Sequence, residues 1–94
     1  MSQSAPSPAP GVIARHVGGE TVLVPTRQGV AEFDNVYLLS RVGAFLWQHL
    51  DGKHDADTLC TLVRERYKVP PERDVTGDVT HFLGELSRRG LLTS

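Results

Sequence analysis

Five side chains in the sequence could bind a metal ion or act in catalysis: four histidines and one cysteine. Imidazole nitrogens and thiolate sulfur are typical zinc ligands, and a thiolate can also act as a nucleophile. The five residues are His16, His49, His54, Cys60 and His81. No two of them have the spacing that places two ligands on one helix face, and there is no C-x-x-C pattern. We therefore expect no metal site and no cofactor.

The sequence also lacks the usual motifs of catalysis. No serine occupies a Gly-x-Ser-x-Gly turn, and no glycine-rich loop could hold a phosphate. Cys60 lies within an apolar helical pattern, where a cysteine behaves as a small core residue. The Asp51-Gly52 pair is explained by the end of a helix. We predict that the chain is not an enzyme and has no catalytic residues.

The composition is typical of one folded domain. The 94 residues are 39% hydrophobic and 22% charged, with a formal net charge of −1. This charge argues against a protein that holds nucleic acid by its phosphates. A lone cysteine cannot form an internal disulfide, no apolar run approaches the roughly 20 residues of a membrane span, and no signal peptide is evident. We expect a cytoplasmic protein without membrane contact.

The first eleven residues, MSQSAPSPAPG, differ from the rest of the chain. They include three prolines and three serines and no charged side chain. Such a segment has little apolar surface to bury on folding. The sequence therefore predicts a disordered tail over residues 1–11 and a folded domain over residues 12–94.

The stretch NVYLLSRVGAFLWQHLDG, residues 35–52, predicts a short strand that runs directly into a helix. The strand covers Val36–Leu39, and the Ser40 hydroxyl can cap the helix that follows. The apolar residues of one helix face are Val42, Phe45, Leu46 and Leu50. Gly52 would end this helix as its left-handed residue.

Two further strands are expected before this stretch, at Val12–Val17 and Thr21–Pro25. Gly18-Gly19 between them favours a two-residue hairpin turn, because both positions can adopt positive φ. Pro25 has no N–H for a strand ladder, so it marks either the end of the second strand or an edge position. Residues 26–34 form a polar connection. The three strands together predict an antiparallel meander with unpaired outer edges.

Two more helices follow. The second begins after the cap residue Asp55, with a buried stripe of Ala56, Leu59, Cys60, Val63 and Tyr67. Pro70-Pro71 ends it. The third runs from about Pro71 or Asp74 to Arg89, with the stripe Val75, Val79, Phe82, Leu83 and Leu86. Gly90 ends this helix, and Leu91-Leu92 fold back against it. The predicted order is βββααα in an α+β fold.

The edge of the third strand is the best candidate for a binding site. An extended peptide can add to such an edge through main-chain hydrogen bonds, while a groove between strand and helix reads its side chains. The alternative is that the stripe of the third helix is ordinary core. For Val79 and Leu86, both interpretations stay open.

Three motifs, in this order and spacing, resemble the PqqD-like family, the small peptide-recognition domains of ribosomal peptide biosynthesis, also called RiPP recognition elements. They are YLLSRVGAFLWQHLDG at 37–52, ADTLCTLVRERYKV at 56–69 and DVTHFLGELSRRGLL at 78–92. The resemblance covers about residues 12–92. Two features differ from the family pattern: Ser40 stands where asparagine is usual, and the connection at 26–34 differs from that of the members tied most closely to PQQ.

The resemblance implies a winged helix-turn-helix variant in which the three strands form the wing. It also implies that a leader peptide adds beside the third strand, against the third helix. The implied peptide-binding residues on the strand are Val36, Tyr37, Leu38 and Leu39. Those on the helix are Val75, Asp78, Val79, Phe82 and Leu86.

The leading hypothesis is a non-catalytic domain that binds the leader of a precursor peptide. It would present the core peptide to a separate enzyme, such as a radical-SAM maturase or a leader peptidase. A structural subunit that binds the maturase but no leader is an alternative. A winged-helix DNA binder is another, but its recognition helix would be net negative. Residues 72–89 carry Arg73, Arg88 and Arg89 against Glu72, Asp74, Asp78 and Glu85.

Overall fold

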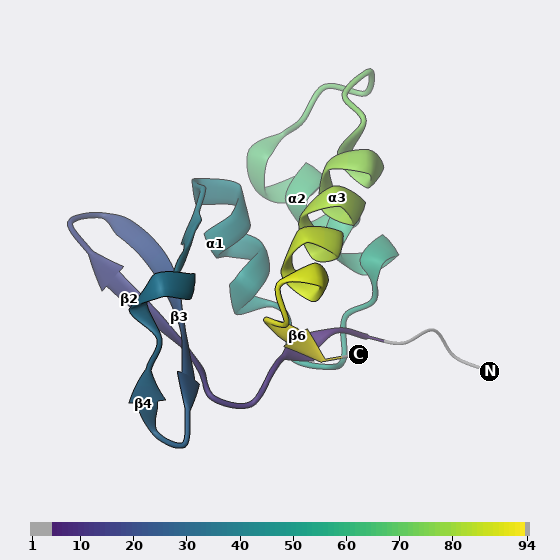
Figure 1. Ribbon diagram of the computed structural model, residues 1–94. Helices are drawn as coiled ribbons and strands as arrows, with labels where there is room; N and C mark the ends of the chain where they lie inside the picture. Colours follow the sequence, from purple (N-terminus) through teal and green to yellow (C-terminus); the bar gives the residue numbers. More distant parts are fainter. Residues whose placement is uncertain (1–4, 94) are drawn as a thin grey trace.

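The computed structural model describes residues 5–93 of the chain. The strands are β1 (Ser7–Pro8), β2 (Val12–Val17), β3 (Glu20–Arg27), β4 (Val30–Ala31), β5 (Tyr37–Leu39) and β6 (Leu92–Thr93). The helices are α1 (Arg41–Gln48), α2 (Ala56–Tyr67) and α3 (Val75–Arg88), and the short 3-10 helix η1 (Phe33–Asn35) precedes β5. The helices gather on one side of β2 and β3 (Figure 1). The predicted α+β class is confirmed.

The main sheet is antiparallel and centred on β3. β2 pairs with one side of β3, while β5 and β4 pair with the other side, at its first and last residues respectively. β1 and β6 form a separate two-stranded sheet. The predicted order βββααα accounts for β2, β3, β5 and the three α-helices. It omits β1, β4 and β6, so it accounts for only part of the structure of residues 5–93.

The predicted strand end at Pro25 was wrong. β3 continues through Pro25 to Arg27, where a turn at Gln28-Gly29 leads into β4. Both turn residues have positive φ, at 53° and 80°. Pro25 pairs with Val12 of β2, and its carbonyl accepts from the Glu32 N–H on the opposite side, so β3 tolerates a position with no N–H of its own. The connection predicted at 26–34 thus contains a second hairpin.

The expected tail over residues 1–11 also contains structure in its described part. β1 pairs antiparallel with β6, in the register Ser7↔Thr93 and Pro8↔Leu92. Ala9 N–H donates to the Leu91 carbonyl (3.0 Å) beside this pairing, and Gly52 N–H, in the loop after α1, donates to the Pro6 carbonyl (3.1 Å). Backbone hydrogen bonds rather than apolar side chains hold this segment in place. Its composition therefore does not predict the strand pairing. Residues 1–4 of the predicted tail lie outside the described residues.

Two of the three helix caps, Ser40 and Asp55, are those that the sequence predicts, and the third is Asp74, one of the two predicted starts of the last helix. The side chains of Ser40, Asp55 and Asp74 accept hydrogen bonds from the backbone N–H groups three residues later. The predicted end of the first helix was wrong, because α1 ends at Gln48 rather than next to Gly52. Gly52 does have a positive φ of 79°, but it turns the loop after the helix.

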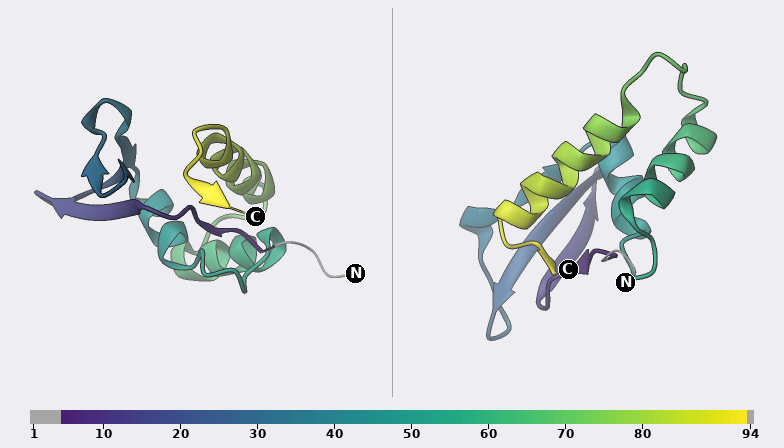
Figure 2. Two further views of the ribbon diagram at one scale, coloured as in Figure 1. Left: turned by 60° about the horizontal axis from the view of Figure 1, so that its bottom comes forward. Right: turned by 90° about the vertical axis from the view of Figure 1, so that its right-hand side faces the viewer.

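The core lies between the sheet and the helices. The side chains with less than 2% exposure are Leu23, Leu46, Leu59, Val79, Leu86 and Leu91. Each contributes about 1.5–3 kcal/mol by leaving water. α2 and α3 lie side by side, and their connecting loop extends away from the sheet (Figure 2). Among residues 5–93, no helix has both the length and the apolar character needed to cross a bilayer.

Candidate functional site

The hairpin between β2 and β3 determines which backbone groups of β3 face each neighbour. Gly18 and Gly19 both have positive φ, so the flanking residues Val17 and Glu20 form a hydrogen-bonded pair. Backbone groups then alternate along β3, with even-numbered residues facing β2. Two observed bonds agree with this alternation. Thr26 N–H donates to the Gly11 carbonyl at 2.9 Å on the β2 side, and the Pro25 carbonyl accepts from Glu32 at 2.8 Å on the opposite side.

The same alternation fixes the orientation of β5. Leu23 pairs with Tyr37 and Thr21 with Leu39, so these two β5 residues direct their N–H and C=O groups toward β3. Leu38 directs its N–H and C=O groups away from β3. No other strand of residues 5–93 pairs with that side of β5. We call this unpaired side of β5 at Leu38 the free edge.

Side chains of β5 alternate between the two faces of the sheet. Leu39 points to the core and is 6% exposed, whereas Leu38 points away from the helices and is 57% exposed. Tyr37 is half-buried on the helix side. The guanidinium of Arg89, just after α3, lies 4.9 Å from the centre of the Tyr37 ring. The end of α3 is therefore held close to β5.

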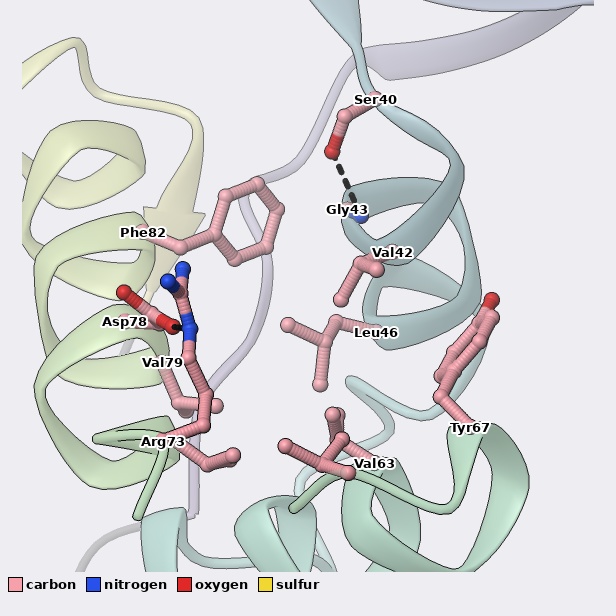
Figure 3. Close-up of a pocket in the computed structure, with 12 residues that line it drawn as sticks. Ser40, Val42, Gly43, Leu46, Val63, Tyr67, Arg73, Asp78, Val79 and Phe82 are labelled. Carbon is pink, nitrogen blue, oxygen red and sulfur yellow. Dashed lines mark hydrogen bonds and ion pairs between the residues drawn. The ribbon is translucent and has the colours of Figure 1, made fainter.

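α3 also approaches the start of α1, directly after β5. A Cβ atom added at Gly43 would lie 3.1 Å from Cε1 of Phe82. A Cβ at this position would be in tight contact, so the ring of Phe82 would have to shift by a few tenths of an ångström. Phe82 is half-buried beside the Ser40 cap of α1, as Figure 3 shows.

A hollow of about 340 Å³ continues from this contact between α1, the end of α2 and the first half of α3. We call it the α1–α3 hollow (Figure 3). Most of its lining is apolar. The lining residues are Ser40, Val42, Gly43, Leu46, Val63, Tyr67, Val69, Arg73, Val75, Asp78, Val79 and Phe82. Because Ser40 directly follows β5, one end of the hollow adjoins the free edge.

The charged groups of the hollow lie on one side of it. Arg73 Nε donates to Asp78 Oδ2 at 2.8 Å, and both side chains are more than half exposed. In Figure 3, the guanidinium of Arg73 lies along α3 toward Phe82. An exposed ion pair of this kind adds little stability. It does place one cation and one anion beside an apolar hollow.

The nine predicted site residues are divided between four environments. Leu39, Val75, Val79 and Leu86 are core residues with at most 6% exposure, although Val75 and Val79 also reach the wall of the hollow. Asp78 and Phe82 line the hollow, and Tyr37 lies under Arg89. Val36 and Leu38 are 42% and 57% exposed on the sheet face away from the helices.

Several residues of the hollow were not predicted as site residues. Val42 was assigned to the buried face of α1 but is 38% exposed, because it extends past the core over the hollow. Arg73 precedes α3 and lies five residues before Asp78, a spacing that gives no sign of a pair. Tyr67 was predicted as core, and it lines the hollow while its ring packs edge-on against Phe45 at 5.6 Å. Only the three-dimensional packing brings these residues together.

Glu85 holds the end of α3 in place. Its carboxylate pairs with Arg88 and, at 3.5 Å, with Nε of Arg89. The hydrogen bond from Arg88 is the main reason why the pKa of Glu85 lies below its ordinary value, and Arg89 lowers this pKa further. Since Arg89 also lies over Tyr37, Glu85 helps to connect α3 to β5.

The histidines and Cys60 do not gather into a site. In the described part of the chain, no group of three His, Cys, Asp or Glu side chains could hold a metal ion. Cys60 is 7% exposed in the core, as predicted. His54 Nδ1 lies 2.8 Å from Asp51 Oδ1, and this hydrogen bond is the largest of the effects that lower the pKa of Asp51.

Comparison with known proteins gives a match to a protein family. The family model described as coenzyme PQQ synthesis protein D (PqqD) matches residues 20–92. The matched region includes β3, β5, all three α-helices and the α1–α3 hollow. No curated protein and no solved structure gives a significant match.

Proposed function

The chain belongs to the PqqD family, and from this premise we propose that it binds the leader segment of a ribosomally synthesised precursor peptide. The observation that carries the proposal is the free edge at Leu38, which adjoins an apolar hollow under α3. The proposed fold is a winged helix-turn-helix variant, with β2, β3 and β5 as the wing. The family description connects such chains with coenzyme PQQ synthesis.

The leader adds as a strand at the free edge. Its backbone pairs with the N–H and C=O of Leu38, which gives affinity without depending on the leader's side chains. Past Ser40, the peptide reaches the α1–α3 hollow, where Val42 and Phe82 offer apolar contacts. The side chains of an extended peptide alternate, so every second one faces the hollow. These are the contacts that would distinguish one leader from another.

The domain contributes no chemistry of its own. It holds the leader so that the attached core peptide stays near a separate modifying enzyme in the cytoplasm, a radical-SAM maturase or a leader peptidase. Tethering raises the effective concentration of the core peptide at that enzyme's active site. The four core residues Leu39, Val75, Val79 and Leu86 support the groove from behind.

The charge distribution on α3 disfavours the DNA-binding alternative. Arg88 and Arg89 pair with Glu85, and Arg73 pairs with Asp78. Each of these three cations thus has a carboxylate partner within the helix or its cap, and residues 72–89 together carry four carboxylates against three arginines, which opposes phosphate contact. The second alternative is a structural subunit that does not bind a leader. In that case no peptide would pair with the free edge.

A titration followed by NMR tests the proposal. The ligand is the leader of the precursor peptide encoded beside this gene, and a scrambled leader of the same composition is the control. Strand addition should slow hydrogen exchange of the Leu38 amide and shift the signals of Tyr37, Ser40 and Phe82. Protection at the outer edge of β2 instead would contradict the proposed site. No binding of leader, together with retained binding of the maturase, would favour the structural subunit.

A further inference from the structure

Leu38 has an exposed side chain beside the backbone groups that form the free edge. The leader binding proposed above uses only those backbone groups. The side chain points away from the α-helices and is 57% exposed. Directly opposite it on β3 lies Val22, which is half-buried on the same face of the sheet. Val36, two residues before Leu38, is 42% exposed. Apolar surface next to the free edge therefore remains in contact with water.

The chain itself covers another part of this sheet face but not the part at Leu38. β4 and η1 contact β3, and Val24 of β3 is only 7% exposed. Val24, Ala31 and Val36 line a hollow on this side, and Leu38 is not among its lining residues. Leu38 instead lines a separate hollow of about 610 Å³, between the β2–β3 turn and the start of α1. The space beside Leu38 is therefore open to a ligand.

A leader strand at the free edge places one of its residues directly opposite Leu38. Residues that lie opposite each other in a sheet direct their side chains to the same face, in parallel and antiparallel pairs alike. This leader residue therefore points away from the α-helices, next to the Leu38 side chain. We call it the outward leader residue. Its two neighbours along the leader point to the other face, toward α3 and the α1–α3 hollow.

We propose that the Leu38 side chain selects leaders whose outward residue is apolar. This inference rests on the proposed function and adds to it a specificity that the hollow does not provide. An apolar outward residue covers part of Leu38 and extends the apolar row of Val22 and Leu38 by one strand, and such cross-strand pairs stabilise a sheet. A leader residue next to it faces the apolar hollow. The substrate class is thus a leader with two adjacent apolar residues, rather than one in which apolar and polar residues alternate.

Selection from a library of random decapeptides displayed on phage tests this specificity without knowledge of the natural leader. The wild-type chain, Leu38→Glu and Leu38→Lys are used separately, and both substitutions keep the N–H that strand addition needs. The wild type should enrich apolar residues at the outward position. Leu38→Glu should enrich lysine and arginine there, and Leu38→Lys should enrich aspartate and glutamate, because opposite charges stabilise a cross-strand pair. The neighbouring positions should keep their preferences.

Isothermal titration with one selected peptide measures the size of the effect. Nuclear Overhauser contacts to the Leu38 methyl groups identify the outward residue of this peptide. Aspartate at that residue should weaken binding to the wild-type chain about two- to fivefold, the range expected for a single cross-strand pair. Leu38→Lys should recover the affinity for the aspartate peptide, because the new cation then lies opposite the carboxylate.

Val17→Lys is the matched control. Val17 is 64% exposed on the same sheet face, but it lies on β2, opposite Glu20 and away from the free edge. This variant should select the same peptides as the wild type, and far-UV circular dichroism checks that all variants are folded. If both Leu38 variants enrich the same outward residues as the wild type, the Leu38 side chain selects nothing and the inference is wrong. If no selected peptide slows hydrogen exchange of the Leu38 amide, the proposed function itself fails.

Discussion

The two sides of α3 contain similar residues in different environments. On the side toward α2 and the sheet, Val79 and Leu86 are 1% and 0% exposed. On the side toward the start of α1, Phe82 is half-buried and Asp78 is more than half exposed. One continuous apolar stripe of the helix therefore serves both as core and as the wall of the α1–α3 hollow. Periodicity along a helix does not separate these two uses.

Proline substitutions in β5 should give the largest effect. Tyr37→Pro removes an N–H that faces β3, so we expect an unfolded or nearly unfolded chain. Leu38→Pro removes an N–H that faces the free edge, so the chain should keep its far-UV spectrum and a cooperative melt. It should bind leader at least tenfold more weakly, about 1.4 kcal/mol.

Alanine at the same positions separates the backbone from the side chain. If Leu38→Pro binds leader as tightly as Leu38→Ala, strand addition at the free edge is wrong. If Tyr37→Pro folds and Leu38→Pro does not, the orientation derived for β5 is reversed.

Truncation on the buried side of α3 should cost about 2–5 kcal/mol of unfolding free energy, as for other core leucines. The substitution is Leu86→Ala, measured by urea denaturation. Val42→Ala, at a residue that is 38% exposed, is the comparison and should cost much less. Equal losses for the two variants would mean that the hollow is as well packed as the core.

Phe82→Ala tests the side of α3 that faces the start of α1 and lines the α1–α3 hollow. Because the ring is half-buried, we expect roughly half of the about 3–5 kcal/mol that a fully buried phenylalanine contributes. Leader affinity should fall at least tenfold by isothermal titration, since the ring forms one wall of the hollow. A variant that does not fold would assign Phe82 to the core and remove it from the site.

Gly43→Ala should affect binding with little change in stability. The added methyl group meets Phe82 at about 3.1 Å, which displaces the ring into the hollow. Alanine gains up to about 1 kcal/mol in helix propensity, and this offsets the displacement. Gly84→Ala in α3 is the matched control, because nothing lies within 4 Å of its added Cβ. It should raise the melting temperature and leave leader affinity unchanged.

The smallest effect concerns the connection between α3 and β5. The pKa of Glu85 is lowered by its hydrogen bond with Arg88 and by Arg89. Its stabilising contribution is therefore present above the ordinary carboxyl pKa and is lost as the pH falls through the lowered value. Glu85→Gln should reduce the melting temperature slightly at pH 7 and not at pH 2. A difference that persists at low pH would show that the charge is not responsible.

Much of the fold could be predicted from local signals. Ser40, Asp55 and Asp74 cap their helices because a side-chain oxygen satisfies a nearby N–H, which is a local requirement. The Gly18-Gly19 turn is predictable for the same reason, because it depends only on the two residues that form it. β1 and β6 could not be predicted, because their pairing joins segments more than eighty residues apart through backbone groups that every sequence has.

The candidate site was predictable only at the level of elements. α3 lines the hollow and β5 ends next to Ser40 at its rim, but the sequence did not assign the individual residues of these elements to groove or core. Leu86 belongs to the core, while Val42 and Arg73 line the hollow without having been named. These assignments depend on how α1 and α3 pack, and the close approach of the Phe82 ring to Gly43 is a contact with no periodic signature in the sequence.

The pairing of β1 with β6 brings residue 7 beside residue 93. The two ends of the described chain therefore lie close together, as Figure 1 shows. When two chain ends lie this close, they can be joined and the chain opened elsewhere without changing the contacts inside the domain. A short linker between these ends and a new opening at Gly18-Gly19, an exposed turn, would give a circular permutant with the same β5 and α3. The same closure would let the domain be inserted into a surface loop of a host protein.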